Sequence, residues 1–242
     1  MEEIMALFQK PFGEQQKTKD VGTNIRWISE RHVACAFLLD TSGSMGTNDA
    51  IGKLNEGLRT FKTQTMNDSQ FDEHTKACID VALISFGPNV VLRQDFVPVS
   101  EMEPPVLSAD GQTPMGEALN MAMDIIAEQK KRYNDSSTPY YRPWIFCITD
   151  GEPNDSYQGA VQRLRKMEDE NRILGYCVGV ENFNRAVMAT IFNKERIFEL
   201  KNLDYPSLFK FVSSSLAAAR NSGETSGGAV AQEAPSTLKM AF

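Results

Sequence analysis

The chain has 242 residues, of which 41% are hydrophobic and 24% are charged, and its formal net charge is -7. This composition is typical of a globular protein, and the length suits one domain with tails rather than two domains. The negative charge and the lack of a dense Lys/Arg run argue against nucleic-acid binding, and no apolar stretch is long enough to span a membrane.

The cysteines and the first residues indicate where the protein works. The four cysteines (Cys35, Cys78, Cys147 and Cys177) each lie inside an apolar run, which predicts buried, reduced thiols rather than a disulfide framework or a metal clip. Residues 1–10 carry acids early and lack the apolar core and cleavage site of a signal peptide. We therefore expect a cytoplasmic protein.

The two ends of the chain differ in composition from its middle. Residues 1–31 mix Gln, Lys and Glu with scattered apolar residues, and we expect a partly flexible N-terminal extension. Residues 221–242 begin Gly/Ser/Ala-rich and polar, which predicts a flexible tail because too little apolar surface can be buried. The apolar residues 238–242 either fray or dock on the domain or a partner. The folded domain is expected at residues 32–220.

Continuous apolar runs predict buried strands, and apolar residues at helical spacing predict helices between them. In chain order the prediction is a strand at 32–40, a helix at 51–61, strands at 78–86 and 90–99, a helix at 115–126, a strand at 143–149, a helix at 160–167, a strand at 173–180, a short helix within 182–192, a strand at 197–200 and a helix at 208–216. The turn before residue 90 has hairpin spacing, so that strand is predicted to be antiparallel.

Buried strands that alternate with helices predict an α/β fold: a Rossmann-like, doubly wound sheet of about six strands, mostly parallel, with one antiparallel edge strand and helices on both faces. Ligands in such sheets lie beyond the carboxyl ends of the strands, where the strand order reverses. The loops that follow the predicted strands are therefore the place to look for function.

Oxygen-bearing side chains gather in three of those loops. Asp40, Ser42 and Ser44 follow the first strand, Asp150 follows the strand at 143–149, and Thr113 lies between them, just before a helix. In an extended loop the i, i+2, i+4 spacing aims three oxygens at one point, with Gly43 allowing a tight turn. Singly these residues are usually helix caps. Together they predict a site for one divalent cation, Mg²⁺ first, with Mn²⁺ or Ca²⁺ as alternatives.

The same segments carry a family resemblance. The Asp40-x-Ser42-x-Ser44 run, the Gly-x-Thr-Pro-x-Gly form at 111–116 and the Thr-Asp-Gly triplet at 149–151 resemble the metal-ion-dependent adhesion site (MIDAS) of von Willebrand factor type A (vWA) domains. The resemblance implies a non-enzymatic protein-binding module. It implies that Ser42, Ser44 and Thr113 contact the metal directly and that the two acids act through water. An open metal position would then take an Asp or Glu carboxylate from a partner protein.

Further segments narrow the resemblance. Residues 38–45, 141–146 and 148–155 resemble the tellurite-resistance-type vWA proteins of bacteria, the TerY group. That group implies an intracellular stress-response system whose kinase and phosphatase components are candidate partners. The long segment before His32 departs from the compact form of the group, which leaves the partner set open. Asp155 is interpreted as a cap of the helix that follows it.

Other functions were weighed against this one. A metal-dependent phosphoester hydrolase with an aspartyl nucleophile also begins with an acid after the first strand, but it needs a second acid two residues later, where this chain has Ser42. The P-loop likeness at 46–53 fails on its spacing. An extracellular adhesin is disfavoured by the four unpaired cysteines and the lack of a signal peptide.

Overall fold

A computed structural model of the chain describes residues 30–67, 73–180, 183–221 and 236–241. The strands of its single sheet are β1 (Val33–Asp40), β2 (Ile79–Phe86), β3 (Val90–Pro98), β4 (Trp144–Thr149), β5 (Leu174–Val180), β6 (Ile197–Leu200) and β7 (Leu238–Met240). The helices are α2 (Ala50–Asn67), α3 (Glu73–Cys78), α4 (Met115–Asp135), α5 (Gln158–Asp169), α6 (Arg185–Ile191) and α7 (Tyr205–Asn221), with 3-10 turns η2 (Gly43–Asp49), η3 (Val99–Glu101) and η4 (Lys194–Arg196).

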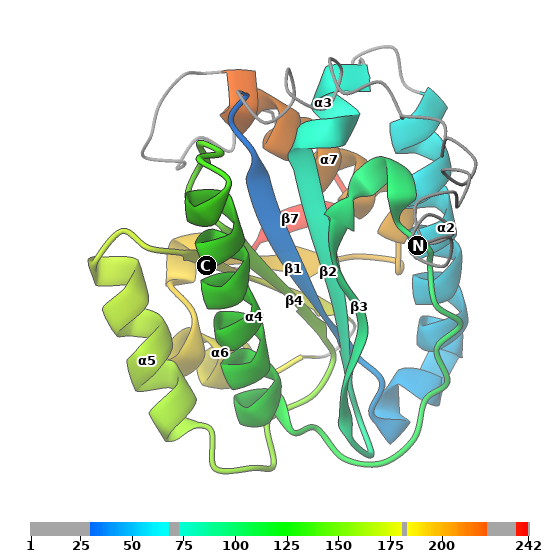
Figure 1. The fold of residues 1–242 in the computed structure, drawn as a ribbon. Helices are drawn as coiled ribbons and strands as arrows, with labels where there is room; N and C mark the ends of the chain where they lie inside the picture. Colours follow the sequence, from blue (N-terminus) through cyan, green and yellow to red (C-terminus); the bar gives the residue numbers. More distant parts are fainter. Residues whose placement is uncertain (1–29, 68–72, 181–182, 222–235, 242) are drawn as a thin grey trace, which may run out of the picture.

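The seven strands are ordered β3-β2-β1-β4-β5-β6-β7. The five central strands β2, β1, β4, β5 and β6 run parallel to one another, whereas the edge strands β3 and β7 are antiparallel to β2 and β6. From β1 the chain adds strands toward one edge of the sheet, and from β4 it adds strands toward the other edge. The connections that follow these two adjacent strands therefore cross opposite faces of the sheet. In Figure 1, β1 and β2 run downward, and the carboxyl ends of the parallel strands lie at the lower end of the sheet.

The central strands are apolar on both faces because helices cover both. Alternate residues of β1 enter two different hydrophobic clusters: Phe37 and its same-face neighbours pack with α2 and α7, and Leu38 packs with α4, α5 and α6 (Figure 1). Every residue of β1 is buried. This two-sided burial explains why the strands have continuous apolar runs rather than an alternating pattern.

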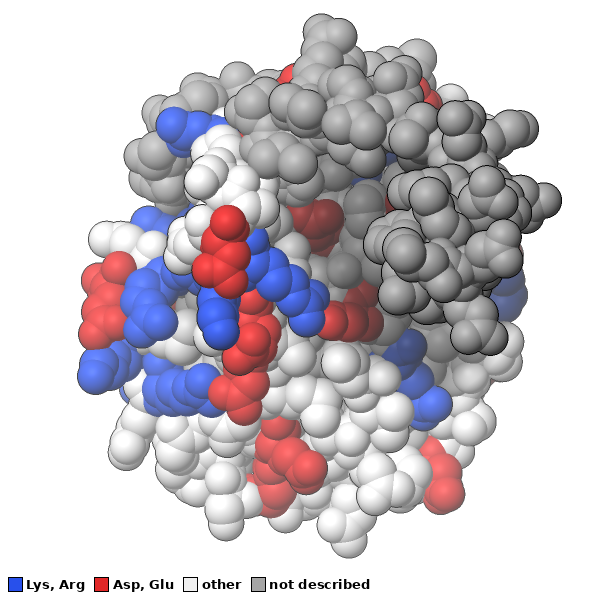
Figure 2. Space-filling view, in the orientation of Figure 1, with Lys and Arg blue, Asp and Glu red and all other residues white. Residues whose placement is uncertain are grey.

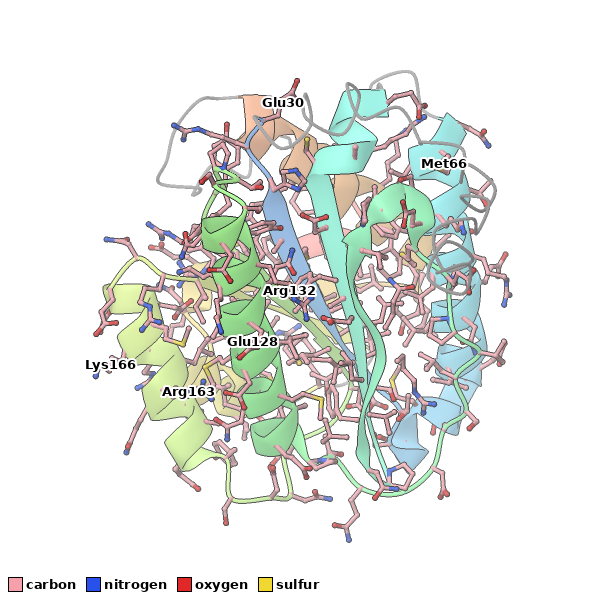
Figure 3. All side chains as sticks on the ribbon, in the orientation of Figure 1. Glu30, Met66, Glu128, Arg132, Arg163 and Lys166 are labelled. Carbon is pink, nitrogen blue, oxygen red and sulfur yellow. The ribbon has the colours of Figure 1, made fainter. Side chains whose placement is uncertain are left out.

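The outer surface over α4 and α5 carries charges of both signs. Figure 2 shows basic and acidic side chains next to one another on this face, and Figure 3 labels Arg132 on α4 and Arg163 on α5. Arg132 pairs with Asp95 at 2.8 Å and Arg163 pairs with Asp124 at 2.6 Å. These exposed pairs contribute little to stability. In each pair the acid balances the positive charge of the arginine, so these two arginines do not form a basic patch.

The structure confirms the predicted fold class, with a mostly parallel sheet and β3 as an antiparallel edge. The sequence analysis counted about six strands and one antiparallel edge, and assigned residues 221–242 to a flexible tail. In the described residues β7 adds a seventh strand and a second antiparallel edge, because Leu238 buries its side chain against α7 while the backbone pairs with β6. The extension at residues 1–31 lies outside the described residues up to residue 29.

Candidate functional site

The three loops identified in the sequence meet at the carboxyl ends of β1 and β4. These two strands are adjacent and parallel, with Leu39 opposite Ile148, so Asp40 and Asp150 leave the sheet side by side. The third loop is fixed to the first, since the N–H of Asp110 donates to the Thr41 carbonyl at 2.8 Å. The sheet therefore brings together segments that are about 110 residues apart in sequence.

Two serine hydroxyls follow Asp40 at close range. The N–H of Ser42 donates to Asp40 Oδ1 at 2.8 Å, and the hydroxyls of Ser42 and Ser44 lie 3.1 Å apart. The sequence analysis expected an extended loop here. Instead the chain turns into η2 at Gly43, and this turn, rather than strand-like alternation, brings the two hydroxyls together.

Gly43 was expected to allow a tight turn, and the chain does turn there, but the turn does not require a glycine. A Cβ at Gly43 would have only an ordinary contact, 3.6 Å from the Gly111 carbonyl oxygen. The glycine that the backbone requires is Gly111, whose φ is +74° and whose Cβ would lie 2.6 Å from Pro88. Gly87 is also constrained, because a Cβ there would lie 2.5 Å from Thr41 Oγ1.

Hydrogen bonds link the serines and Asp40 to the loop after β4. Ser44 Oγ donates to Asp150 Oδ1 at 2.8 Å. Thr149 Oγ1 donates to Asp40 Oδ2 at 2.5 Å and accepts the Gly151 N–H at 3.1 Å. Both oxygens of the Asp40 carboxylate are thus hydrogen-bonded, and the acid is held in one orientation although its side chain is fully buried.

Thr113 reaches the same cluster from the third loop. Its Oγ1 would lie 3.3 Å from a Cβ placed on Gly151, and Asp40 Oδ2 would lie 3.8 Å from the same point. A side chain at position 151 would therefore crowd the Thr113 hydroxyl, whereas its contact with Asp40 would be an ordinary one. All five residues named by the sequence therefore lie around one point: Asp40, Ser42, Ser44, Thr113 and Asp150.

The loops carrying Thr113 and Asp150 are fastened to each other. The N–H of Thr113 donates to Asn154 Oδ1 at 3.1 Å, and the N–H of Asn154 donates to the Thr113 carbonyl at 3.2 Å. Asp155 was interpreted from sequence as a cap of the helix that follows it, and this is wrong. Its two carboxylate oxygens accept the N–H groups of Gly116 and Glu117 at 3.1 Å and 2.9 Å, so Asp155 caps α4.

Sequence reasoning did not identify Asn154 and Thr149 as residues that support the site. Thr149 was treated only as part of the Thr-Asp-Gly triplet, and Asn154 only as part of a resemblance. The sequence does contain a signal, because two further polar residues, Asn154 and Asp155, closely follow the triplet. The structure places both of them against the start of α4. A polar pair in that position indicates a cross-loop clamp.

The electrostatics of the site favour a cation. Burial, together with the nearby Asp150, raises the pKa of Asp40 from 3.8 to about 6, although the hydrogen bonds from Ser42 and Thr149 act to lower it. Two carboxylates and three hydroxyls form a set of oxygen donors only, which suits a hard divalent ion. Among the described residues, no group of three or more His, Cys, Asp or Glu side chains could hold a metal ion.

One cavity in the described residues lies away from this site. A cavity of about 520 Å³ lies near the amino end of β2, with His32, Asp80 and Tyr133 in its lining, and none of the five donor residues lines it. The four cysteines are buried free thiols, as predicted. In the part of the chain that the structure describes, no helix is both long and apolar enough to cross a membrane.

Known proteins with similar sequences or structures extend these observations. The profile described as "von Willebrand factor type A domain" matches residues 35–211. No curated protein matches the chain. Among solved structures, the chain is similar to proximal thread matrix protein 1 from the mussel byssus, with a TM-score of 0.54 and 17% identity over 78% of this chain and 47% of that one. Another structure of that mussel protein is described as having a zinc-occupied MIDAS motif (TM-score 0.53, 18% identity, 79% and 46% covered).

The chain is also similar to the pilus adhesin SpaC from Lactobacillus rhamnosus GG, with a TM-score of 0.60 and 12% identity over 77% of this chain and 31% of that one. The vWF domain of the type V pili tip protein Mfa5 from Porphyromonas gingivalis has a TM-score of 0.55 and 10% identity over 81% of this chain and 98% of that domain. At these identities the likeness establishes the fold alone. The chain spans less than half the length of the mussel protein and of SpaC.

Proposed function

The chain belongs to the von Willebrand factor type A domain family, and on that basis we propose that it is a metal-dependent protein-binding module. The observation that carries the proposal is the convergence of oxygen donors from three loops, with Ser44 bonded to Asp150 and Thr149 bonded to Asp40. The zinc-occupied MIDAS motif of the similar mussel protein supports it.

In this proposal Ser42, Ser44 and Thr113 hold the ion directly, and Asp40 and Asp150 hold it through water. When bound, the ion supplies a Lewis-acidic point that accepts one oxygen from outside. The acids are already engaged by protein donors, Asp40 by Ser42 and Thr149, which favours neutral hydroxyls as the direct ligands. An ion with few charged ligands keeps a strong attraction for an incoming Asp or Glu carboxylate of a partner protein. Mg²⁺ is the proposed resident ion, with Mn²⁺ or Ca²⁺ as alternatives.

The proposed setting follows from the TerY-group resemblance: a cytoplasmic, bacterial stress or tellurite-resistance-type system, with its kinase or phosphatase components as candidate partners. The proposed role is non-enzymatic. An aspartyl-nucleophile hydrolase would need an acid at position 42, and the residue there is a serine whose hydroxyl lies 3.1 Å from Ser44 Oγ.

Metal binding is tested first with the purified chain. Isothermal titration with Mn²⁺ should give one site per chain, and Ser42→Ala/Ser44→Ala should weaken it at least tenfold. A matched control removes another neighbouring pair of hydroxyls, Ser136 and Thr138, which lie 2.8 Å apart near the end of α4. Unchanged Mn²⁺ binding in the Ser42/Ser44 variant would refute the assigned site.

Partner binding is tested by affinity capture from the native host, with and without EDTA, using the wild type and the same variants. The proposal expects partners that are lost with EDTA and with Ser42→Ala/Ser44→Ala but kept with the control pair. Capture of the same proteins in every condition would show that the metal does not mediate binding. Turnover of a generic phosphoester with Mg²⁺, lost on Asp40→Ala, would favour the hydrolase instead.

A further inference from the structure

The sheet edge formed by β6 is occupied by a very short strand from the C-terminal end of the described chain. Three register pairs join β6 and β7: Phe198 with Met240, Glu199 with Lys239, and Leu200 with Leu238. Two backbone hydrogen bonds extend the pairing: from the Lys201 N–H to the Thr237 carbonyl at 2.8 Å, and from the Ala241 N–H to the Ile197 carbonyl at 3.0 Å. Without β7, the parallel strand β6 would be an open edge that can pair with another chain.

Two side chains give this docking its specificity. Leu238 is 2% exposed and enters the same hydrophobic cluster as residues of α7. Thr237 Oγ1 donates to Asp204 Oδ2 at 2.9 Å, and Asp204 Oδ1 accepts the Ser207 N–H in the first turn of α7 at 3.3 Å. The β6 edge thus offers a buried position for a leucine, here called the apolar slot, and a carboxylate that accepts a hydroxyl from the residue before that leucine.

Few contacts hold the segment in place. Among residues 237–241 only Leu238 is buried, while Lys239 is exposed and Met240 is 47% exposed. Ordering five residues costs conformational entropy that one buried side chain and a few hydrogen bonds only just offset. Because the segment belongs to the same chain as β6, its effective concentration at this edge is higher than that of a separate peptide. A strand that depends on its tether in this way is open to exchange.

We propose that the β6 edge is a strand-docking site for an extended segment of a partner protein, and that β7 is its displaceable occupant. The partner segment adds a strand antiparallel to β6, a mode of recognition in which the backbone supplies affinity and alternate side chains supply specificity. Its expected pattern is a serine or threonine for Asp204, then a leucine for the slot, then a basic residue opposite Glu199. This site is separate from the proposed metal site and does not depend on it.

The probe for the test is a fluorescein-labelled peptide of residues 234–242, titrated against the full chain by fluorescence anisotropy. Two variants should empty the edge: Leu238→Asp puts a charge in the apolar slot, and Thr237→Glu puts a carboxylate against Asp204. Both should bind the peptide at least tenfold more tightly than the wild type, in which the tethered strand competes. Met240→Gln, a change at an exposed position of the same strand, should behave like the wild type.

Two results would overturn the proposal. One is equal binding of the peptide to the wild type and to both folded variants. The other is no binding to either variant. A peptide carrying Leu238→Asp should not bind, because it lacks the group that fills the slot. A concentration-dependent dimer of the wild type that Leu238→Asp abolishes would support the same exchange with a second copy as the donor.

Hydrogen exchange tests displacement in the wild type itself. The amides of Lys201 and Ala241, which bond across the β6–β7 pair, should exchange at least 100-fold faster than the amide of Val178 in the interior strand β5. Equal protection would mean that β7 opens only when the whole domain unfolds, and the site would then not be exchangeable. Leu238→Asp should leave Mn²⁺ affinity within about twofold of the wild type, so a failure of either proposal can be recognised separately.

Discussion

Thr113 and Asn154 exchange two hydrogen bonds, one from each backbone N–H, across loops that come from different strands. The Thr113 hydroxyl is therefore positioned by a residue of the loop that carries Asp150. We predict that Asn154→Ala lowers Mn²⁺ affinity about tenfold, as expected when an orienting partner of a metal ligand is lost. Isothermal titration measures the change.

The matched control is Asn193→Ala, which removes an asparagine that caps η4, before the amino end of β6. It should leave Mn²⁺ affinity unchanged. If Asn154→Ala bound Mn²⁺ as tightly as the wild type, Thr113 would either not need the clamp or not be a ligand.

Asp155 stabilises α4 from outside that helix. Because its carboxylate accepts the Gly116 and Glu117 N–H groups at the positive end of the helix, Asp155→Ala should lower the free energy of unfolding by roughly 1 kcal/mol. Urea denaturation measures this loss. Asp135→Ala removes an acid from the opposite end of α4 and should cost nothing, so a similar loss in both variants would argue against capping.

The buried charge of Asp40 is predicted to lower the stability of the metal-free protein. Its pKa is raised from 3.8 to about 6 in the folded chain, so the native state favours the protonated acid. The contribution of Asp40 to stability is fully present below pH 3.8 and is lost as the pH rises through 6, which amounts to about 3 kcal/mol at neutral pH without metal. In EDTA at pH 7.5, Asp40→Asn should therefore unfold at a higher temperature than the wild type, and the difference should shrink at pH 4.

Metal should reverse that order. At 1,000 times its dissociation constant, a bound ion adds about 4.1 kcal/mol to the wild type, and Asp40→Asn should gain much less. Thermal unfolding at pH 7.5 with and without Mn²⁺ measures both effects. A variant that is less stable than the wild type in EDTA at neutral pH would contradict the assignment of Asp40 as an unneutralised buried charge.

His32 forms a buried pair with Asp80 at the other end of the sheet, with Nδ1 and Oδ2 2.7 Å apart. Burial lowers the pKa of His32, but the hydrogen bond that its Nδ1–H donates to the Asp80 carboxylate outweighs this effect and raises the pKa from 6.5 to about 10. The contribution of the pair is full below pH 6.5 and is lost as the pH rises to 10. We predict that His32→Gln costs roughly 3 kcal/mol at pH 6 and clearly less at pH 10, measured by urea unfolding. Equal costs at both values would refute the charged pair.

The sequence predicted the sheet well because strands buried on both faces have continuous apolar runs, and helices between them have a clear period. It missed β7 because Leu238 alone is buried there, and one buried residue leaves no period to detect. It brought together the five residues of the candidate site because acids and hydroxyls at strand ends are a local signal, and their role as metal ligands stays a prediction. It misassigned Asp155 because local spacing favours the next helix, whereas the tertiary fold brings the first turn of α4 closer.

The gathering of donors from positions 40 to 150 also sets an order of events in folding. An ion cannot bind until β1 and β4 lie side by side and the loop before α4 has been clamped by Asn154. Protein groups alone make those contacts. If the proposed site binds an ion, the ion would bind after these contacts have formed, and its occupancy would respond to the ion supply rather than to new synthesis.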